Sequence, residues 1–316
     1  MITIGGVSLD VSHPKAFAST LETYCMDMRY QYVCDPGFRT EEEGNWFKNR
    51  FNLDAIVDTI DEMVDKVDVG FIQSCNWDKH LDQAMPFIEK GKPVFIDKPI
   101  VGSMADIDRL RSLVAGGAKI MGSSSVRYCP EIRNFLSQSE EVRGKILTIY
   151  GTSGTDEFNY SVHIVEAMSQ LAGAKACKCQ YLGEALTADK QRCQSYSIDY
   201  ENGIKGIYSA CLDVWQPFVI VVVTTKSVYH FEVDLNQIYP SLLREIYKEL
   251  ARGESILADA EELINCTQIM LCGKKSRDER NGQAVSIEEL EPGDRFDGDA
   301  FEKEYALIAN RNVYKD

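Results

Sequence analysis

The chain has 316 residues, 44% of them hydrophobic and 26% charged, which is the composition of an ordinary soluble globular protein with room for two domains. Its formal net charge of −15 argues against nucleic acid and anionic membranes as partners, because both require a basic face. No transmembrane segment is expected, since the longest apolar run, residues 218–223, is only strand-sized.

Cysteine and histidine usage indicates a reducing compartment and no metal site. The ten cysteines show no pairing or metal-binding pattern, and the N-terminal MITIGGVSLD lacks the basic region of a signal peptide. We therefore expect a cytoplasmic protein with free thiols. The four histidines include no HxH or HxxxH pair, so no zinc site is expected.

From the N-terminus to residue 122 the pattern alternates between strand and helix. We predict strands at 2–7, 29–34, 69–72, 93–96 and 119–122, and helices at 14–25, 53–67, 78–90 and 103–115. The helix at 53–67 rests on apolar residues at a helical period, and 40–51 is predicted as a loop or a short helix. Repeated βα units of this kind form a doubly wound parallel sheet.

Ligands of such sheets lie over the carboxyl ends of the strands. Four segments follow predicted strands, namely 6–13, 35, 74–80 and 97–99. The candidate cofactor-binding residues from these segments are Gly6, Ser8, Val11, His13, Asp35, Ser74, Asn76, His80, Asp97 and Lys98.

The first of these turns departs from the G-x-G-x-x-G pattern of dinucleotide-binding folds. Gly6 is in place, but Ser8 and Val11 stand where the second and third glycines would be. Those glycines let the backbone approach a pyrophosphate and let the helix pack closely. Serine keeps its backbone amide, so valine is the larger departure, and this turn alone does not predict a cofactor.

Asp35 ends the second predicted strand, near the offset at which an acidic residue binds the ribose hydroxyls of adenosine. A turn aspartate before Pro-Gly is an equally good interpretation. If Asp35 binds ribose, its charge repels a 2′-phosphate and favours NAD over NADP, although Arg39 lies close in sequence and leaves NADP open.

The second half has a different pattern. Helices at 130–137 and 158–172 and a strand at 144–150 precede long strand-like runs at 175–186, 192–200, 204–215, 217–223 and 227–233. Asn202-Gly203 predicts a hairpin turn, and consecutive strands with short turns predict an antiparallel sheet with one face left for a partner subunit. Helices are predicted at 240–252 and 259–272, then a charged segment at 273–281, a strand near 284–287 and a weakly helical tail at 299–310.

Two residues are candidates for proton chemistry. Lys98 stands between an apolar strand and a proline, where the alternative interpretation is a surface lysine at a strand end. His163 lies on the polar stripe of helix 158–172, with Tyr160 before it and Glu166 after it. A structural histidine is the alternative there, but a helix N-terminus lowers the pKa of an imidazole and favours the neutral form that accepts a proton.

In their order along the chain these segments resemble the Gfo/Idh/MocA family. The similar features are Ser74-Cys75-Asn76 with His80, Gly91-Lys92 leading to Asp97-Lys98-Pro99 where the family usually has Glu-Lys-Pro, and Ser161-Val162-His163 followed by Leu171-Ala172-Gly173, which resembles the family's G-x-H helix. The late segments 249–254 and 272–274 look like its C-terminal helices. The resemblance covers nearly the whole chain.

The resemblance implies an α/β protein with a Rossmann domain at 1–122 and a substrate-binding α+β domain at 123–316. The second domain would carry a large, mostly antiparallel open sheet used to form a homodimer or homotetramer, and its C-terminal helices would pack back on the first domain. The implied activity is NAD(P)-dependent oxidation or reduction of a sugar-like alcohol or ketone. Lys98 would hold the reacting oxygen and His163 would be the general acid/base. The implied substrate-binding residues are Arg127, Tyr128, Asn159, Tyr160 and Trp215.

One departure concerns the histidine. Many members carry an aspartate four residues before it, and here that position is Asn159, which stabilises an imidazolium less well. Two alternatives therefore stay open beside an NAD-dependent dehydrogenase. One retains NAD and catalyses glycoside cleavage, elimination or epimerisation through a transient ketone, and the other is a non-catalytic relative that binds the cofactor or has lost turnover.

Overall fold

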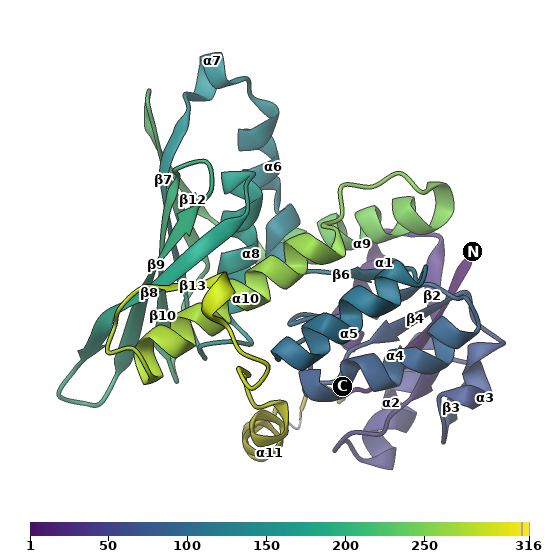
Figure 1. Cartoon of the computed structure of the whole chain (residues 1–316). Coiled ribbons are helices and arrows are strands. Elements are labelled where there is room, and N and C mark those ends of the chain that lie inside the picture. The colour runs from purple at the N-terminus through teal and green to yellow at the C-terminus, as the bar shows by residue number, and fades with distance from the viewer. Residues whose placement is uncertain (311, 316) are drawn as a thin grey trace.

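A computed structural model describes residues 1–310 and 312–315. Positions 311 and 316, both within the predicted second domain, lie outside the described residues. The chain forms two sheets side by side, with helices packed around and between them (Figure 1). One sheet is parallel and the other mostly antiparallel, which confirms the predicted fold class. The boundary at 122/123 stays a prediction.

The first sheet has six parallel strands in the order β3-β2-β1-β4-β5-β6. They are β1 (Ile2–Val7), β2 (Met28–Cys34), β3 (Ala55–Val57), β4 (Val69–Ile72), β5 (Val94–Ile96) and β6 (Ile120–Gly122). The chain starts in β1, builds outward to β3, and returns to the other side of β1 at β4. The order therefore reverses between β1 and β4, and in sheets of this kind ligands bind over the carboxyl ends of the strands at that point.

Helices flank this sheet on both faces. They are α1 (His13–Thr23), α2 (Glu41–Phe51), α3 (Asp61–Val64), the 3₁₀ turn η1 (Trp77–Lys79), α4 (His80–Glu89) and α5 (Met104–Ala115). The segment predicted as a loop or short helix folds as α2, because Thr40 and Glu43 form a reciprocal capping box at its start.

The predicted helix at 53–67 is wrong. Asn52 adopts a left-handed conformation that ends α2, and Ala55–Val57 then pairs with β2 as the edge strand β3. Only Asp61–Val64 is helical. The β-branched Ile56 and Val57 suit a strand, and a strand of three residues is too short to show an alternating pattern.

The second sheet has seven strands in the order β12-β11-β7-β10-β9-β8-β13. They are β7 (Ile146–Ser153), β8 (Ala176–Leu186), β9 (Arg192–Tyr200), β10 (Lys205–Leu212), β11 (Val219–Thr224), β12 (Val228–Glu232) and β13 (Val285–Ser286). Neighbours are antiparallel except for the parallel pair of β7 and β10. The predicted turn joins β9 to β10, with Gly203 at φ 85°.

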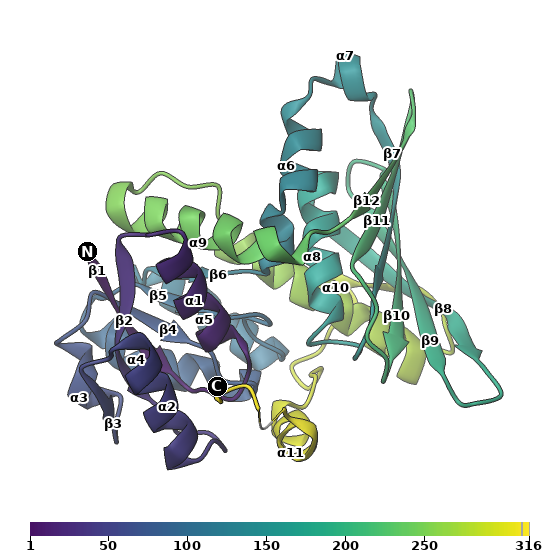
Figure 2. The ribbon, with the colours of Figure 1, turned by 180° about the vertical axis from the view of Figure 1, so that it is seen from behind.

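The remaining helices belong to the second half of the chain, and several of them lie between the two sheets (Figures 1 and 2). They are η2 (Ser125–Tyr128), α6 (Pro130–Ser137), α7 (Glu140–Arg143), α8 (Ser161–Ala172), α9 (Leu235–Arg252), α10 (Ala260–Asp278), η3 (Ile287–Glu289) and α11 (Gly298–Ile308). α9 starts earlier than predicted because Asp234 caps it, and α10 continues past residue 272. α9 packs on α1, and α10 packs on α5 and β6.

After β13 the chain returns to the first sheet. Both views place α11 at the bottom of the molecule, to the side of that sheet that faces the second one (Figures 1 and 2). The hydroxyl of Tyr314 donates to the carbonyl of Val11 at 2.8 Å. The end of the chain therefore contacts the turn between β1 and α1, the first of the predicted ligand-binding segments.

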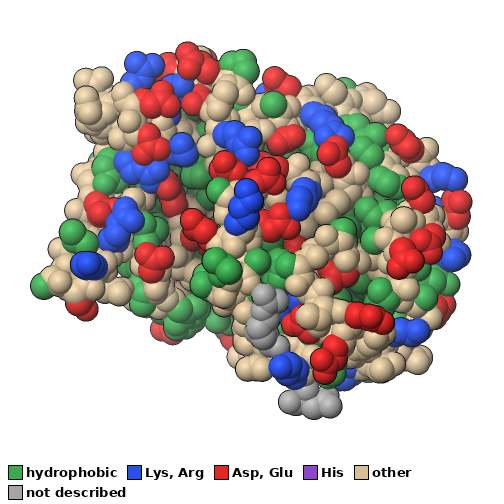
Figure 3. Space-filling model, turned by 90° about the horizontal axis from the view of Figure 1, so that it is seen from below, with side chains coloured by type: hydrophobic (Ala, Val, Ile, Leu, Met, Phe, Trp, Pro, Cys, Tyr) green, Lys and Arg blue, Asp and Glu red, His purple; other side chains and the backbone are tan. Residues whose placement is uncertain are grey.

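Charge is mixed on the face of the molecule that carries α11. Lysine and arginine side chains are interspersed there with aspartate and glutamate and form no broad basic surface in that view (Figure 3). In the part of the chain that the structure describes, no helix combines the length and apolar character that a bilayer span requires.

Candidate active site

Lys98 lies at the carboxyl end of β5 and is buried, with an exposed fraction of 8%. Its Nζ donates to the backbone oxygen of Asn159 at 3.0 Å and to the Asn159 Oδ1 at 2.8 Å. The same ammonium stands 5.5 Å from the centre of the Tyr160 ring. The peptide bond to Pro99 is cis. The Rossmann sheet and the loop before α8 therefore meet at this one cation.

The negative charges of three carboxylates act on the Lys98 ammonium. Burial lowers the pKa of Lys98, and the charges of Asp97, Asp156 and Glu166 oppose that shift. Asp97 also pairs with Nδ1 of His13 at 2.5 Å. Burial alone would raise the pKa of Asp97, but the charges of His13 and Lys98 lower it. A buried ammonium is thus kept beside carboxylates that compensate its charge.

His163 lies in the first turn of α8 and is also buried. Its Nδ1 is 2.6 Å from the hydroxyl oxygen of Ser124, and its ring lies 5.8 Å from Tyr160 and 5.1 Å from Phe218. Burial, reinforced by the charge of Lys98, holds the pKa of His163 well below its ordinary value. Its Nε2 has no hydrogen-bond partner among residues 1–310 and 312–315, so this nitrogen is available to a ligand.

Glu166 acts on His163 only through a serine. Its carboxylate accepts from the Ser123 hydroxyl at 2.5 Å and from the Ser124 amide at 2.8 Å, and Ser124 in turn contacts His163. Burial raises the pKa of Glu166. The two serines were not predicted from the sequence, because only the fold brings the end of β6 against α8.

Asp156 was also missed by sequence reasoning. It precedes α8, and its Oδ1 accepts from the amides of Phe158 and Tyr160 at 3.0 and 3.1 Å. Its Oδ2 accepts from the Asn159 side chain at 3.4 Å. An aspartate shortly before a helix is a common capping signal, and it could have been found on that ground. The chain of contacts runs from Asp156 through Asn159 to Lys98.

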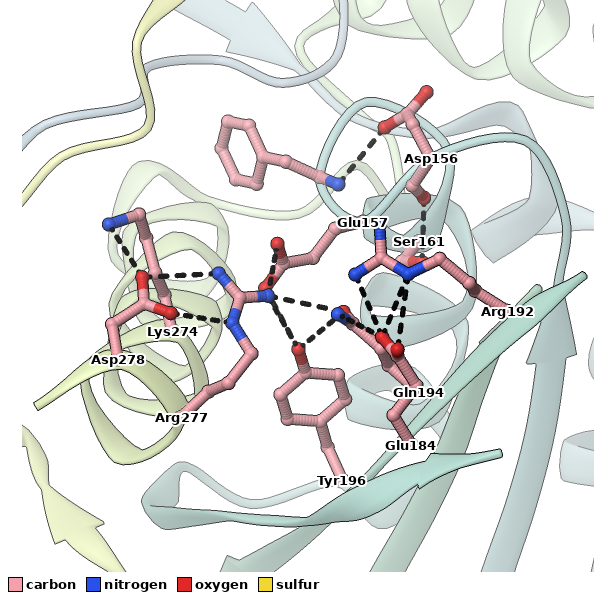
Figure 4. A network of polar contacts seen from close by, with 11 residues as sticks. Asp156, Glu157, Ser161, Glu184, Arg192, Gln194, Tyr196, Lys274, Arg277 and Asp278 are labelled. Carbon is pink, nitrogen blue, oxygen red and sulfur yellow. Dashed lines mark hydrogen bonds and ion pairs between the residues drawn. The ribbon is translucent and has the colours of Figure 1, made fainter. Parts of the chain in front are cut away.

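A polar network behind this loop fixes its position (Figure 4). Arg277 of α10 pairs with Glu157 at 2.5 Å and donates to Tyr196 and Gln194 of β9, each at 3.1 Å. The hydroxyl of Tyr196 donates to Glu157 at 2.9 Å. Because Glu157 stands two residues before Asn159, the network ties the loop that holds Lys98 to both the second sheet and α10.

The other predicted substrate-binding residues are placed differently. Arg127 is 1% exposed, and its guanidinium binds Glu262 at 2.6 Å. The hydroxyl of Tyr128 accepts from the amide of Ala258 at 2.8 Å. Trp215 is 59% exposed on the loop after β10. The structure therefore brings together Lys98, Asn159, Tyr160 and His163, while Arg127 binds Glu262 of α10 and Tyr128 binds the backbone just before that helix.

The turn between β1 and α1 is satisfied internally. Gly6 lies within β1, and Ser8 adopts φ 73°, a conformation that glycine favours. The amide of Leu9 donates to Asp35 at 3.0 Å, and the amide of Asp10 donates to the Ser8 hydroxyl at 3.1 Å. Burial raises the pKa of Asp35 to about 6. Asp35 is thus joined to the turn that a pyrophosphate would approach.

Arg39 fills the other side of this turn. It is buried, and it donates to the carbonyls of Leu9 at 3.2 Å and Asp10 at 2.7 Å. It also pairs with Glu43 at 3.0 Å and donates to the carbonyl of Asn310 at 3.0 Å. The guanidinium is therefore fully engaged with protein groups.

The segment after β4 holds three more candidates. The hydroxyl of Ser74 donates to Gln83 at 2.7 Å. His80 is fully buried, with its ring nitrogens 2.9 Å from the carbonyl of Ser74 and 3.3 Å from that of Ile100. Asn76 donates to α11. Of these three, His80 is bound on both nitrogens within the protein.

The loops have the residue types that a dinucleotide needs. Ser8 has the backbone conformation of a glycine, Asp35 carries a carboxylate at the end of β2, and Asn76 offers an amide at the end of β4. All three lie at carboxyl ends of strands on either side of the reversal in strand order. The types of residue at these positions therefore suit NAD, although the chain's own C-terminal segment contacts the same loops.

One group of side chains among the described residues has the spacing of metal ligands. Ligand atoms of Asp10, Cys75 and Glu302 lie within 4.8 Å of one another. Burial and the neighbouring carboxylates raise the pKa of the Cys75 thiol, which opposes the thiolate that a metal requires. The group is of interest chiefly because Glu302 comes from α11.

Comparison with known proteins agrees with this geometry. Residues 15–123 match the family model described as an oxidoreductase family with an NAD-binding Rossmann fold. No curated protein matches the chain. Among solved structures, a probable dehydrogenase from Thermotoga maritima is similar with a TM-score of 0.79 at 15% identity, over 92% of this chain and 100% of that one.

Two further structures are similar to the same extent. A putative myo-inositol dehydrogenase from Sinorhizobium meliloti 1021 has a TM-score of 0.77 at 16% identity, over 91% of this chain and 100% of that one. A scyllo-inositol dehydrogenase from Lactobacillus casei, solved with NAD(H) and scyllo-inositol, has a TM-score of 0.77 at 16% identity, over 92% of this chain and 100% of that one. Likeness at this identity shows the shared fold. The sequence match covers residues 15–123, and over that stretch it agrees with the resemblance to the Gfo/Idh/MocA oxidoreductase family with its NAD-binding Rossmann fold.

Proposed function

We propose that this protein is an NAD-dependent oxidoreductase that interconverts a sugar- or polyol-like alcohol and its ketone. The observation that carries the proposal is the meeting of Lys98 and His163 beside Tyr160, at the carboxyl edge of a Rossmann sheet. Oxidation of a carbinol removes a proton from its hydroxyl as the hydride leaves, so it needs a base and a group that holds the oxygen.

The chain's own groups suit those two roles. The Lys98 ammonium, oriented by Asn159, donates a hydrogen bond to the reacting oxygen. His163 is neutral near physiological pH because its pKa is held low, and its Nε2 accepts the hydroxyl proton. In the reverse direction the same nitrogen returns the proton. Ser124 fixes the ring through Nδ1, which sets where Nε2 points.

NAD supplies the hydride acceptor or donor when bound. Asp35 would take the adenosine ribose, while Ser8 and Asn76 would face the diphosphate and Lys98 the nicotinamide side. The carboxylate of Asp35 and the full engagement of Arg39 both favour NAD over NADP, since no free cation of this loop awaits a 2′-phosphate.

The aromatic rings beside His163 support this substrate class. The rings of Tyr160 and Phe218 flank His163, with Tyr160 and Phe218 stacked at 6.2 Å. Aromatic faces beside hydrogen-bonding groups suit a polyhydroxylated ring, which has apolar C–H faces and polar edges. The similar structure solved with scyllo-inositol is a scyllo-inositol dehydrogenase, which supports a cyclic polyol.

We further propose a homodimer or homotetramer formed through the second sheet. Alternation along β11 turns Ile220 and Val222 inward, leaving Val219, Val221 and Val223 half-buried on the outer face. An apolar open face of this kind favours a partner subunit. Light scattering after gel filtration gives the mass directly, and a monomer would contradict the assignment.

The test of the main proposal combines cofactor binding with turnover. Purified protein is titrated with NADH by fluorescence up to millimolar concentration, and the near-ultraviolet absorbance of NADH is then followed with NAD and a panel of inositols and sugars. The proposal expects saturable NADH binding and stoichiometric NADH formation with at least one cyclic polyol. Absence of any cofactor binding would contradict it.

Asn159 favours one alternative reaction, in which NAD is retained and the product is an epimer or an eliminated sugar. The Asn159 side chain is neutral and binds Lys98, so it brings no negative charge that would stabilise a protonated His163. In that case the substrate changes by chromatography while no net NADH accumulates. The same assay therefore separates the two reactions.

A further inference from the structure

The C-terminal segment of the chain lies over the loops assigned above to the dinucleotide. We call residues 297–310 and 312–315 the C-terminal strap. It begins with α11, which both ribbon views place at the bottom of the molecule, to the side of the first sheet that faces the second (Figures 1 and 2). The order of strands reverses between β1 and β4, and the strap contacts the segments that follow β1, β2 and β4.

The first part of the strap binds the segment after β4 through its acidic side chains. The Asn76 amide donates to Asp299 at 2.8 Å and to Glu302 at 3.0 Å, and Lys79 pairs with Glu302 at 2.6 Å. These are two donors at the end of a Rossmann strand, and each is met by a carboxylate oxygen. A diphosphate presents the same kind of anionic oxygen to such donors.

The carboxylate of Glu302 also lies at the place where the order of strands reverses, between the ends of β1 and β4. It lies within 4.8 Å of ligand atoms of Asp10, which follows β1, and of Cys75, which follows β4. This is the place where ligands of doubly wound sheets bind. A second carboxylate beside Asp10 repels an incoming phosphate as long as the strap stays in place.

The close approach of α11 depends on a glycine. A Cβ atom built on Gly298 would lie 2.3 Å from Oδ1 of Asn76 and 3.0 Å from the carboxyl carbon of Asp78. The Gly298 amide donates to Asp78 at 2.9 Å. By contrast, a Cβ on Gly293, shortly before the strap, would meet nothing within 4 Å.

The second part of the strap closes the adenosine end. The carbonyl of Asn310 accepts from Arg39 at 3.0 Å, and the carbonyl of Val313 accepts from Lys15 at 2.6 Å. The Tyr314 hydroxyl donates to Val11 at 2.8 Å, and its ring is 1% exposed, edge-on to Phe47 at 5.9 Å. The strap therefore makes defined contacts both with the segment after β4 and with the turn between β1 and α1.

We propose that the C-terminal strap is an autoinhibitory element that competes with the dinucleotide, with Asp299 and Glu302 occupying the donors Asn76 and Lys79 that the diphosphate takes when the strap leaves. This inference rests on the proposed function, because it assumes that NAD is the ligand of the groove. The apparent affinity for NAD is then the intrinsic affinity reduced by the fraction of molecules whose strap is open.

Two pairs of variants test the strap without removing it. Gly298→Ala introduces a clash at the start of α11, and Gly293→Ala is its control. Glu302→Gln removes the charge beside Lys79, and Glu304→Gln, at an exposed position two residues later in the same helix, is its control. We expect Gly298→Ala and Glu302→Gln to tighten NADH binding on the order of tenfold, while both controls match the wild type. Thermal melts of all four variants confirm that each is folded.

Amide hydrogen exchange supplies a second readout that needs no turnover. In the unliganded protein the strap amides should be protected, and saturating NADH should increase their exchange. Equal NADH affinity in the wild type, Gly298→Ala and Glu302→Gln, or strap amides that stay protected with NADH bound, would overturn the inference and leave the proposed function standing. Failure of NADH to bind the wild type and all of the variants would overturn both the inference and the proposed function.

Discussion

The two ends of the groove along the first sheet differ in how their polar groups are satisfied. At one end, His163 is held through Nδ1 while its Nε2 has no partner among the described residues. At the other end, the amides and carbonyls of the turn between β1 and α1 are bound by Asp35, Arg39 and Tyr314. The first end keeps a ring nitrogen that can bind a substrate, whereas the polar groups of the second end are already bound by other parts of the chain.

This difference separates the residues proposed for catalysis from the residues that control access of the cofactor. A turn that binds a diphosphate offers it free backbone amides. Here the amides of Leu9 and Asp10 already donate to Asp35 and to the Ser8 hydroxyl. Variants at the Lys98 end should therefore change turnover, and variants at the Arg39 end should change stability and cofactor access.

The largest expected effect is at Lys98. Lys98→Met removes the ammonium that holds the reacting oxygen, so turnover should fall by about 10²- to 10⁴-fold with NADH binding retained. Lys90→Met is the matched control, because Lys90 only forms an exposed ion pair with Asp65. Initial rates of NADH formation give the comparison. Turnover within a few fold of the wild type would remove Lys98 from the mechanism.

Arg39→Met should have the next largest effect, and on stability. Both Arg39 and Glu43 are buried, with side chains 1% and 6% exposed, so loss of the guanidinium leaves the Glu43 carboxylate without its cation and two turn carbonyls without their donor. We expect the free energy of unfolding to fall by about 3–5 kcal/mol. Urea unfolding measures it.

The control for Arg39 is Arg50→Met, which breaks an exposed pair with Glu22. That change should cost less than about 1 kcal/mol. Equal losses in the two variants would mean that the turn is not held together by Arg39, and the contrast between the two ends of the groove would disappear.

Much of the fold was predictable from the sequence, because it depends on local patterns. The alternation of strands and helices in the first domain and the Asn202-Gly203 turn were predicted and are observed. The strand β3 was not, since its three residues shared a helical period with their neighbours. The start of α9 was missed because Pro240 lies inside the helix, not at its beginning.

The site was predictable only where one segment carries its own signal. Lys98 stands at a strand end and His163 on a polar helical stripe, and both are visible in the sequence. The roles of Ser124 and Glu302 depend on contacts between segments far apart in the chain, as does the contact of Tyr314 with Val11. No spacing rule joins such residues before the fold is known.

Asp35 should make stability depend on pH at the closed end of the groove. Its pKa is raised by burial to about 6 in the folded protein, against roughly 3.9 when unfolded. The folded state therefore binds the proton more tightly, and the contribution of Asp35 to stability is lost as the pH rises from about 4 to about 6. Asp35→Asn keeps an oxygen for the Leu9 amide but has no charge.

We therefore expect Asp35→Asn to match the wild type at about pH 4 and to exceed it by about 1–2 kcal/mol at about pH 8, after allowance for the partial exposure of the side chain. Urea unfolding at several pH values gives the difference. A difference that stays constant over this range would show that Asp35 does not titrate as its surroundings indicate.

The smallest expected effect tests the contact between Asn159 and Lys98. Asn159→Asp places a carboxylate where Oδ1 now lies 2.8 Å from the Lys98 ammonium. Burial lowers the pKa of Lys98, and a new anion this close raises it again. Because the ammonium form holds the reacting oxygen, activity is lost as the pH rises through that pKa. The alkaline limb of the kcat profile should therefore move up by about one pH unit.

Asn49→Asp, which adds the same charge at an exposed position of α2, should leave the limb in place. If the alkaline limb is unchanged in both variants, a group other than Lys98 controls it. The contact between Lys98 and Asn159 would then only hold the two sheets together.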